Sequence, residues 1–203
     1  MIMKMAARCD TTANREVKSP GWQDRDLVER FRRGDQGAFE QIIAEHAPWI
    51  TALAQRLLGW SDGAEDVTQE VFLAAYRKLA SFRGQATLRT WLTTVTINQC
   101  RRHQSKRLAY LRLRHQTAQH KTQPQPDEPD TQQRRREQDT AVRQAVATLP
   151  PRYREVLVLH YLQGLEVAQV AQVLGINRKT VYVRLSRARK RLEDKLSTIW
   201  QDR

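Results

Sequence analysis

The sequence predicts an all-α protein made of two small helical domains joined by a flexible linker, with a helix-turn-helix in the second domain. Apolar residues recur at spacings of three and four through most of the chain, and no segment shows the alternation typical of a strand. Proline and glutamine gather in one central segment, which has too little apolar surface to offset the entropy lost on ordering. The length of 203 residues allows one ordinary domain or two small ones.

These patterns divide the chain into four segments. Residues 1–21 lack periodicity, and we expect them to form a disordered tail. We expect a first helical domain over residues 22–112, a flexible linker over 113–138 and a helix-turn-helix domain over 139–198. The linker contains Pro124, Pro126 and Pro129, so we expect two compact modules that move independently on a loose tether.

Start and stop signals predict successive helices in the first domain. Leu27 and Phe31 share one face of the first helix, and Gly34 ends it. The signals that predict the starts of the later helices are, in chain order, Asp35 as a cap, Pro48 before a third helix, a capping box from Asp62 to Glu65, and Thr87. Each start is followed by an apolar stripe at helical spacing, so the domain is expected to bury one face of every helix.

The second domain ends in two helices separated by a tight turn. Ala171 is small where two helices must cross closely, and Gly175 permits the turn between them. Ile176, Val181 and Leu185 then anchor the last helix, which we expect Asn177 to open. This is the arrangement of a helix-turn-helix, whose second helix lies in the major groove of DNA.

The outward face of the last helix supplies the candidate groups for reading duplex DNA. Arg can pair in two places with guanine, and Lys or Asn can reach other base edges. The candidates are Asn177, Arg178, Lys179, Thr180, Tyr182, Val183, Arg184 and Arg187. The alternative is an ordinary helical hairpin with a solvated basic face.

The overall charge points to a polyanionic partner. The chain has 35 Lys and Arg against 22 Asp and Glu, a net charge of +13, and its isoelectric point is about 10.4. Basic side chains neutralise phosphates and release condensed counterions. Charge alone does not choose among DNA, RNA and lipid.

One helix of the first domain opposes this trend with a cluster of acids. Carboxylates favour the start of a helix because of its dipole, which is one explanation for them. The other is a surface for a protein partner, since DNA would repel it. Downstream, aromatic and basic residues interleave from Phe82 to Arg102, as in grooves that hold unpaired bases, although Trp91 on composition alone fits a core position.

Catalytic signatures are missing, so we expect no enzyme and no cofactor. The sequence contains none of the phosphate-loop, zinc-protease or serine-hydrolase motifs, and its five histidines show no ligand spacing, so no metal site is expected. Cys100 is expected to be a small, half-buried helical residue. No apolar run is long enough for a membrane span or a secretion signal, so we expect a cytoplasmic protein without membrane insertion.

Two sets of motifs resemble the sigma-70 family of RNA polymerase sigma factors, in its extracytoplasmic-function (ECF) class. The run from Ala64 to Phe72, then Phe82-Arg83-Gly84, then Arg89 to Leu92 with Asn98, resembles the second conserved region of that family. The second set of motifs resembles the fourth conserved region. It consists of Leu149-Pro150, Arg154 to Leu157, Gly164-Leu165 and the helix-turn-helix segment that ends with Ser186 to Arg189. The likeness covers residues 24–107 and 139–196.

The resemblance implies a transcription initiation factor with core RNA polymerase and promoter DNA as partners. Its control is expected to come from outside, by an anti-sigma protein as a third partner or by the level of expression. It implies that core polymerase is bound by Glu65, Asp66, Gln69, Glu70 and Phe72. It implies contacts to a separated −10 promoter strand by Phe82, Arg83, Gly84, Arg89, Thr90, Trp91, Asn98, Arg101 and Arg102, while the last helix reads the −35 element as duplex. Because the two elements lie far apart, the unassisted protein should bind promoters poorly.

Two other functions remain open at this point. The first is a dimeric helix-turn-helix regulator that acts without becoming a polymerase subunit, and it predicts protection of a palindromic site by the protein alone. The second is a binder of RNA or other polyanions without sequence preference, which predicts a steep salt dependence without promoter discrimination.

Overall fold

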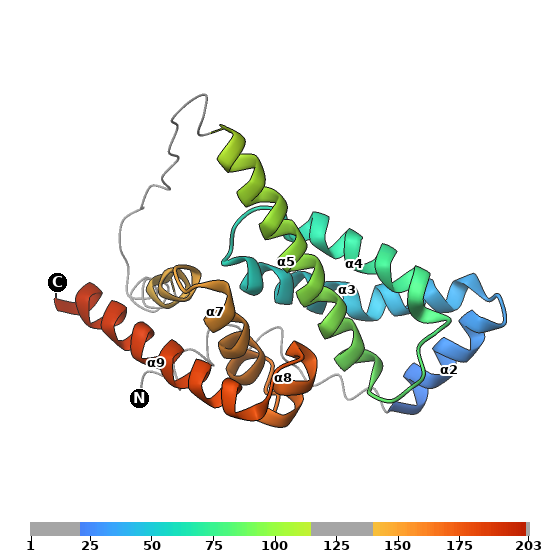
Figure 1. The fold of residues 1–203 in the computed structure, drawn as a ribbon. Helices are drawn as coiled ribbons and strands as arrows, with labels where there is room; N and C mark the ends of the chain where they lie inside the picture. Colours follow the sequence, from blue (N-terminus) through green and yellow to red (C-terminus); the bar gives the residue numbers. More distant parts are fainter. Residues whose placement is uncertain (1–20, 115–139, 202–203) are drawn as a thin grey trace, which may run out of the picture.

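The computed structural model describes residues 21–114 and 140–201, and these residues form helices and turns with no strand among them, which confirms the all-α prediction (Figure 1). The expected tail and linker lie outside the described residues except at their edges, where Gly21 starts the first helix and the fourth extends to Arg114. The elements are α2 (Gly21–Arg32), α3 (Gln36–Leu58), α4 (Ala64–Leu79), α5 (Leu88–Arg114), a helical segment over 140–147, α7 (Pro151–Leu157), the π-helix η1 (Val158–Leu162), α8 (Val167–Leu174) and α9 (Arg178–Gln201).

Helices α2 to α5 form the first block around one apolar core. Helices α3, α4 and α5 each pack against the other two, and α2 lies along α3 (Figure 1). Leu53, Val71 and Leu92 are fully buried where the three helices meet. Phe39 extends this core towards α2, with its ring 5.6 Å from that of Phe31. The helical spacing of apolar residues therefore predicted the buried faces correctly.

Helix α3 continues through Pro48, so the predicted start of a separate helix there is wrong. A proline within a helix removes one backbone donor and usually kinks or ends it. Here Pro48 and Ala44, whose carbonyl loses that donor, are both exposed, and water can satisfy the carbonyl. The buried side chains before and after Pro48 share one core, which favours a single helix.

The start of α4 differs from the predicted capping box. The N-cap residue is Gly63, with a φ of +101° and no side-chain cap. A Cβ on Gly63 would lie 2.6 Å from Cε1 of the His103 ring on α5. The close approach of α5 therefore determines how this helix begins, and Glu65 and Asp66 complement the helix dipole in its first turn.

The second block consists of the 140–147 helix, α7, η1, α8 and α9. Pro150 caps α7 and Pro151 occupies its first turn, as the sequence predicted for a break at this point. Val146 and Leu149 pack with Leu157 and with Leu192 and Leu196 of α9 in a cluster of their own. Gly175 ends α8 and α9 follows at once, which confirms the expected helix-turn-helix order.

The two blocks are packed against each other, whereas the sequence predicted independent modules. The core of the first block continues into Val156, Leu159 and Val170 of the second. Across the same boundary Trp49 Nε1 donates a 2.7 Å hydrogen bond to Gln163 Oε1. The apolar faces of α7 and α8 are visible in the sequence, but their partner, the α3–α5 layer, is determined only by the tertiary fold.

Gly59 makes one of these contacts between blocks possible. It ends α3 with a φ of +75°, a conformation that L side chains rarely adopt. A Cβ there would lie 3.2 Å from the Cα of Ala147 and would overlap the guanidinium of Arg154. That guanidinium donates a 2.8 Å hydrogen bond from Nη1 to the carbonyl of Ala147. The glycine therefore serves both the turn and the approach of the second block.

Candidate polymerase and nucleic-acid interfaces

The exposed face of α4 is acidic, as the sequence predicted. Glu65, Asp66, Gln69 and Glu70 are all exposed. Leu73 follows one turn later on the same face and is 53% exposed. We call these five residues the α4 face. Leu73 is not among the residues predicted from the sequence, although its spacing from Gln69 and Glu70 places it beside them on a helix.

Phe72 does not lie on the α4 face. It is only 8% exposed, and its ring packs edge-on against Phe39 at 6.4 Å. The helical period turns Phe72 away from its neighbour Leu73 and into the core. Its position therefore supports α4 from beneath instead of presenting a contact to a partner.

A polar cavity of about 630 Å³ lies at the start of α4, between the two blocks. Asp62, Glu65 and Asp66 line it from the first block, and Arg143 lines it from the second. Trp60 also lines it and packs on the apolar cluster of the second block. The acidic start of α4 thus faces the second block in the packed arrangement.

A smaller groove of about 210 Å³ runs between α4 and α5. Asp66 and Glu70 line one side, and Arg102 and Lys106 line the other. The acidic residues predicted to bind polymerase therefore lie next to Arg102, a basic residue predicted to bind DNA. Asp66 and Arg102 lie on different helices and far apart in the sequence, so only the fold brings them together.

Two of the predicted −10 residues, Phe82 of the α4–α5 loop and Trp91 of α5, lie against each other. The rings of Phe82 and Trp91 lie 5.4 Å apart, tilted by 51°, and both side chains are half-buried. Arg32 of α2 donates hydrogen bonds to the carbonyls of Ala80, at 3.2 Å, and of Phe82, which hold the loop on the first block. Arg83 and Gly84 at its tip are exposed.

Polar residues at the start of α5 cap its first turn. Thr87 Oγ1 accepts a 3.1 Å hydrogen bond from the backbone N–H of Thr90, which confirms the predicted helix start. The two threonine hydroxyls are also hydrogen-bonded, at 2.9 Å. Arg89 in the same turn lies with its guanidinium 4.3 Å from the Trp49 ring centroid of α3. Thr90 and Arg89 therefore each have a partner within the protein.

Farther along α5, the predicted DNA contacts separate into two groups. Asn98 and Arg102 are exposed. Arg101 instead donates hydrogen bonds from Nε and Nη2 to the two carboxylate oxygens of Glu155 on α7, each 2.7 Å long. The bond to Glu155 raises the pKa of the Arg101 guanidinium further. All nine predicted −10 residues therefore lie on the α4–α5 loop or on α5. Arg89, Thr90 and Arg101 have partners within the protein, and the partner of Arg101 belongs to the second block.

Helix α9 presents the predicted recognition face. Asn177 Oδ1 accepts hydrogen bonds from the backbone N–H of Thr180 at 2.7 Å and from its hydroxyl at 2.8 Å, so Asn177 is the cap, as predicted. Val181 and Leu185 are buried, while Ile176 is half-buried. The remaining candidates are exposed or half-buried: Arg178, Lys179, Thr180, Tyr182, Val183, Arg184 and Arg187.

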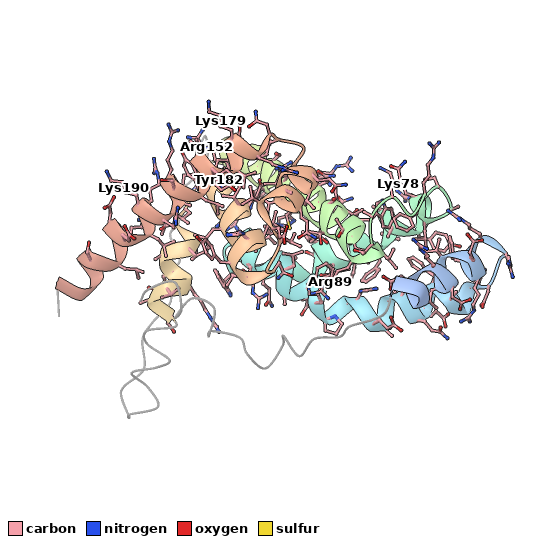
Figure 2. All side chains as sticks on the ribbon, turned by 90° about the horizontal axis from the view of Figure 1, so that it is seen from below. Lys78, Arg89, Arg152, Lys179, Tyr182 and Lys190 are labelled. Atoms are coloured by element: carbon pink, nitrogen blue, oxygen red, sulfur yellow. The ribbon has the colours of Figure 1, made fainter. Side chains whose placement is uncertain are left out.

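A second arginine-rich surface adjoins this face. Figure 2 shows Lys179 and Lys190 extending outward from α9, and Arg152 belongs to α7. The guanidiniums of Arg152 and Arg191 lie 4.8 Å and 5.2 Å from the centroid of the Tyr153 ring. Sequence reasoning did not select Arg152, because its distance from α9 along the chain hides their proximity in the fold.

Two family models match the chain over the same two blocks. "Sigma-70 region 2" matches residues 42–118 and "Sigma-70, region 4" matches residues 139–192. The RNA polymerase sigma-H factor of Pseudomonas aeruginosa is 31% identical over 187 residues, which cover 89% of this chain and 97% of that protein. The ECF RNA polymerase sigma factor SigM of Mycobacterium tuberculosis is 33% identical over 171 residues, covering 83% of this chain and 82% of its own.

Solved structures of similar proteins have the same fold. CnrH, in complex with the cytosolic domain of CnrY, aligns with a TM-score of 0.60 and 27% identity over 87% of this chain and 98% of its own. The sigma factor RpoE of Bartonella quintana, in complex with the anti-sigma factor NepR, aligns with a TM-score of 0.62 and 25% identity over 78% and 96%. Among the helices that the structure describes, none has the length and apolar composition needed to cross a membrane. With both sigma-70 regions matched in order and whole-length relatives above 30% identity, this chain belongs to the ECF class of the sigma-70 family of RNA polymerase sigma factors.

Proposed function

We propose that this sigma factor directs RNA polymerase to promoters with three separate surfaces: the α4 face for core enzyme, the α4–α5 loop with α5 for the −10 strand, and α9 for the −35 duplex. The observation that supports this division most strongly is the separation of charge. The α4 face is acidic around an exposed leucine, while the outward residues of α5 and α9 are predominantly basic. A polyanion and a protein partner are thereby offered different faces, which adjoin along the α4–α5 groove that Asp66, Glu70, Arg102 and Lys106 line.

The α4 face has the composition of a protein-binding surface. Interfaces concentrate their binding energy in a few apolar residues surrounded by polar groups that exclude water. Leu73 is exposed and has Gln69 and Glu70 one turn away. The proposed partner is a basic, partly apolar surface of core polymerase, and Phe72 supports the helix from the core.

The proposed −10 surface combines stacking with cationic groups. Everting a base from a duplex costs a few kcal/mol, and stacking on an aromatic ring returns ~1 to 3 kcal/mol per base. Phe82 and Trp91 offer half-buried rings at the point where the loop meets α5. Asn98 and Arg102 are exposed farther along the helix, where the strand would continue.

The proposed −35 surface is the exposed face of α9. Its first turn begins at the Asn177 cap, and Arg178 and Lys179 are its first exposed basic side chains. In a helix-turn-helix, these N-terminal positions are the ones that reach base edges in the major groove. Tyr182 follows one turn later and is exposed, while Arg187 lies on another side of the helix, next to Tyr153 of α7.

The packed arrangement also accounts for regulation in this proposal. Arg101 can contact a promoter strand only after it releases Glu155, so the unassisted protein binds promoters weakly and core polymerase favours the separated arrangement. The two similar solved structures are both complexes, and one of them holds the sigma factor RpoE with the anti-sigma factor NepR. We therefore extend the proposal to an anti-sigma protein that holds this chain inactive. Because polymerase and chromosome are cytoplasmic, the proposal places the protein there.

Runoff transcription tests the proposal. Core polymerase is supplied with fragmented genomic DNA in the presence and absence of the purified protein, and transcripts are sequenced from their 5′ ends. We expect new starts at a small set of promoters that share a −35 and a −10 sequence, and only when the protein is added. An unchanged set of starts, combined with protection of a palindromic site by the protein alone, would instead establish the dimeric regulator.

A further inference from the structure

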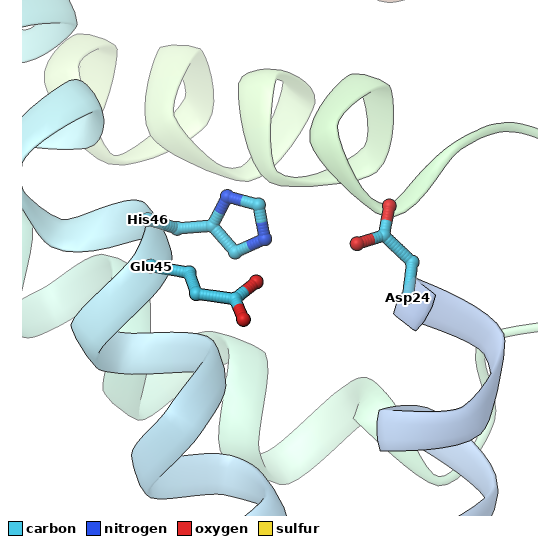
Figure 3. Close-up of side chains that lie close together, drawn as sticks. All are labelled: Asp24, Glu45 and His46. Atoms are coloured by element: carbon cyan, nitrogen blue, oxygen red, sulfur yellow. The ribbon is translucent and has the colours of Figure 1, made fainter. Parts of the chain in front are cut away.

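Three ligand-type side chains meet between α2 and α3, and none of the three belongs to the surfaces discussed above, although Arg89 of the −10 set lies nearby. Figure 3 shows Asp24, in the first turn of α2, facing Glu45 and His46 of α3. One carboxylate oxygen from each acid and one imidazole nitrogen all lie within 4.8 Å of one another. Asp24 lies about twenty positions before Glu45 and His46 in the sequence, so no local motif predicts the cluster.

Two atoms of this cluster are buried without a hydrogen bond. Asp24 is 7% exposed and His46 is 6% exposed. In the part of the chain that the structure describes, Asp24 Oδ1 and His46 Nε2 have no hydrogen-bond partner and no solvent contact. A buried polar atom left without a partner costs about 1 to 3 kcal/mol. Two such atoms facing the same small space indicate a ligand that both can bind.

We propose that Asp24, Glu45 and His46 bind a divalent transition-metal ion of the zinc class. Imidazole nitrogen together with carboxylate oxygen is a donor set that suits zinc, whereas calcium and magnesium prefer oxygen alone. Three protein ligands leave the fourth position of a tetrahedral ion to water. Glu45 is exposed, so an ion can enter from solvent at that side of the cluster.

The geometry requires only a small contraction. Tetrahedral ligands at ~2.0 to 2.2 Å from zinc lie about 3.3 to 3.6 Å from one another, compared with separations of up to 4.8 Å in the structure. The exposed Glu45 side chain can change rotamer, and Asp24 lies in the first turn of its helix, where the backbone adjusts most easily.

The surrounding charges are consistent with this ligand. Burial, with a smaller contribution from Arg89, lowers the pKa of His46 to about 4, so the imidazole is neutral at pH 7 and its lone pair is available. Burial and the Glu45 charge raise the pKa of Asp24, and Arg89 acts on it in the opposite direction. Arg89 is the cation that competes with the metal for Asp24, and its guanidinium lies over Trp49.

Zinc binding to the full-length, untagged protein tests this proposal. After treatment with a chelator and its removal, the protein is titrated with Zn²⁺ by calorimetry in the presence of a competing chelator. We expect one ion per chain, and a melting temperature that rises with zinc. His46→Gln and Asp24→Asn should each weaken zinc binding by more than about 100-fold, because even indirect supporting residues of metal sites are worth 10- to 100-fold. Arg89→Gln should tighten it.

Matched controls separate this site from adventitious binding. Asp26→Asn removes an exposed acid from α2 and His103→Gln removes a histidine from α5, and neither should change the affinity. Circular dichroism identifies any ligand variant that fails to fold, and cobalt substitution adds an independent measurement, because tetrahedral Co²⁺ absorbs strongly in the visible range. The proposal is overturned if the wild-type protein binds no zinc, if His46→Gln and Asp24→Asn bind it as tightly as the wild type, or if magnesium competes equally.

Discussion

Arg101 of α5 and Glu155 of α7 form a bidentate ion pair in which both hydrogen bonds are 2.7 Å long. The pair joins the two sigma-70 regions of this chain. Glu155 has a side chain only 9% exposed, while 42% of the Arg101 side chain remains accessible. A buried carboxylate needs its partner more than an accessible guanidinium does. The pair therefore favours the packed arrangement while it occupies a proposed DNA contact.

Glu155→Gln should open the two blocks. Because Arg101 is partly exposed, we expect the loss to be only about 1 to 2 kcal/mol, which corresponds to roughly a tenfold shift in population. Energy transfer between dyes on α3 and α9 should fall, and binding of the unassisted protein to a single-stranded −10 oligonucleotide should strengthen by up to about tenfold. Glu193→Gln, an exposed acid of α9, is the control. Unchanged energy transfer and binding in Glu155→Gln would show that the pair does not govern opening.

Changes to the α4 face should weaken polymerase binding without unfolding the protein. Leu73→Ala should cost about 1 to 2 kcal/mol of binding, because an apolar residue surrounded by polar groups is a typical hot spot. The double reversal Asp66→Lys with Glu70→Lys should abolish association through like-charge repulsion. Glu40→Lys reverses an exposed acid of α3 and should leave association intact. Pull-down of core polymerase measures the association of each variant, and circular dichroism checks its helical content. Equal binding by all variants would contradict this docking surface.

Substitutions on α9 should separate base reading from phosphate contact. If Arg178 or Arg184 reads a base, its replacement by Ala should cost ~1 to 3 kcal/mol and relax preference at one position of the −35 element. A uniform loss across all sequences would instead identify a phosphate contact. Lys195→Ala, farther along the same helix and exposed, should leave the preference unchanged. Competition binding of holoenzyme to a −35 library provides the comparison.

Gly63→Ala should destabilise the first block. Its φ of +101° disfavours any side chain, and the new Cβ would meet the His103 ring. We expect a loss of about 2 kcal/mol in urea unfolding. The double variant with His103→Ala should recover only the steric part, while Gly84→Ala, which has a φ of +67° and open space around it, should show the backbone part alone. A Gly63→Ala loss no larger than that of Gly84→Ala would mean that His103 moves aside without cost.

The alkaline pH dependence of stability should report on Cys100. Burial, with a smaller contribution from the Glu155 charge, raises the pKa of this thiol from its usual 9.0 to about 12. Between these values the folded chain holds a proton that the unfolded chain releases, so the Cys100 contribution is present below pH 9 and is lost as the pH rises. From pH 8 to 10 the wild type should lose ~1 kcal/mol more unfolding free energy than Cys100→Ala. Parallel profiles in the two proteins would contradict the raised pKa.

The thiol also provides an independent check of burial. In a Cys9→Ser background, Cys100 is the only thiol of the chain. At 3% exposure it should react with a thiol reagent only as fast as the protein opens. Rapid labelling at neutral pH would show that the helix face around Cys100 is accessible.

The helices, their buried stripes and the order of the two regions could be predicted from the chain alone, because they depend on local periodicity and capping. Val181 and Leu185 are buried as their spacing predicted, and Asn177 caps α9. The acids of the α4 face are exposed for the same reason. Such features need no knowledge of what the helix packs against.

Which distant residues meet depends on how the helices pack. Helix α3 runs through Pro48, and the His103 ring sits where a side chain on residue 63 would be. Arg101 joins Glu155, and Asp24 faces His46, because packing brings together groups that no local pattern relates. Burial and electrostatics depend on these long-range neighbours, and for that reason the packed blocks and the proposed metal cluster could not be foreseen from the chain alone.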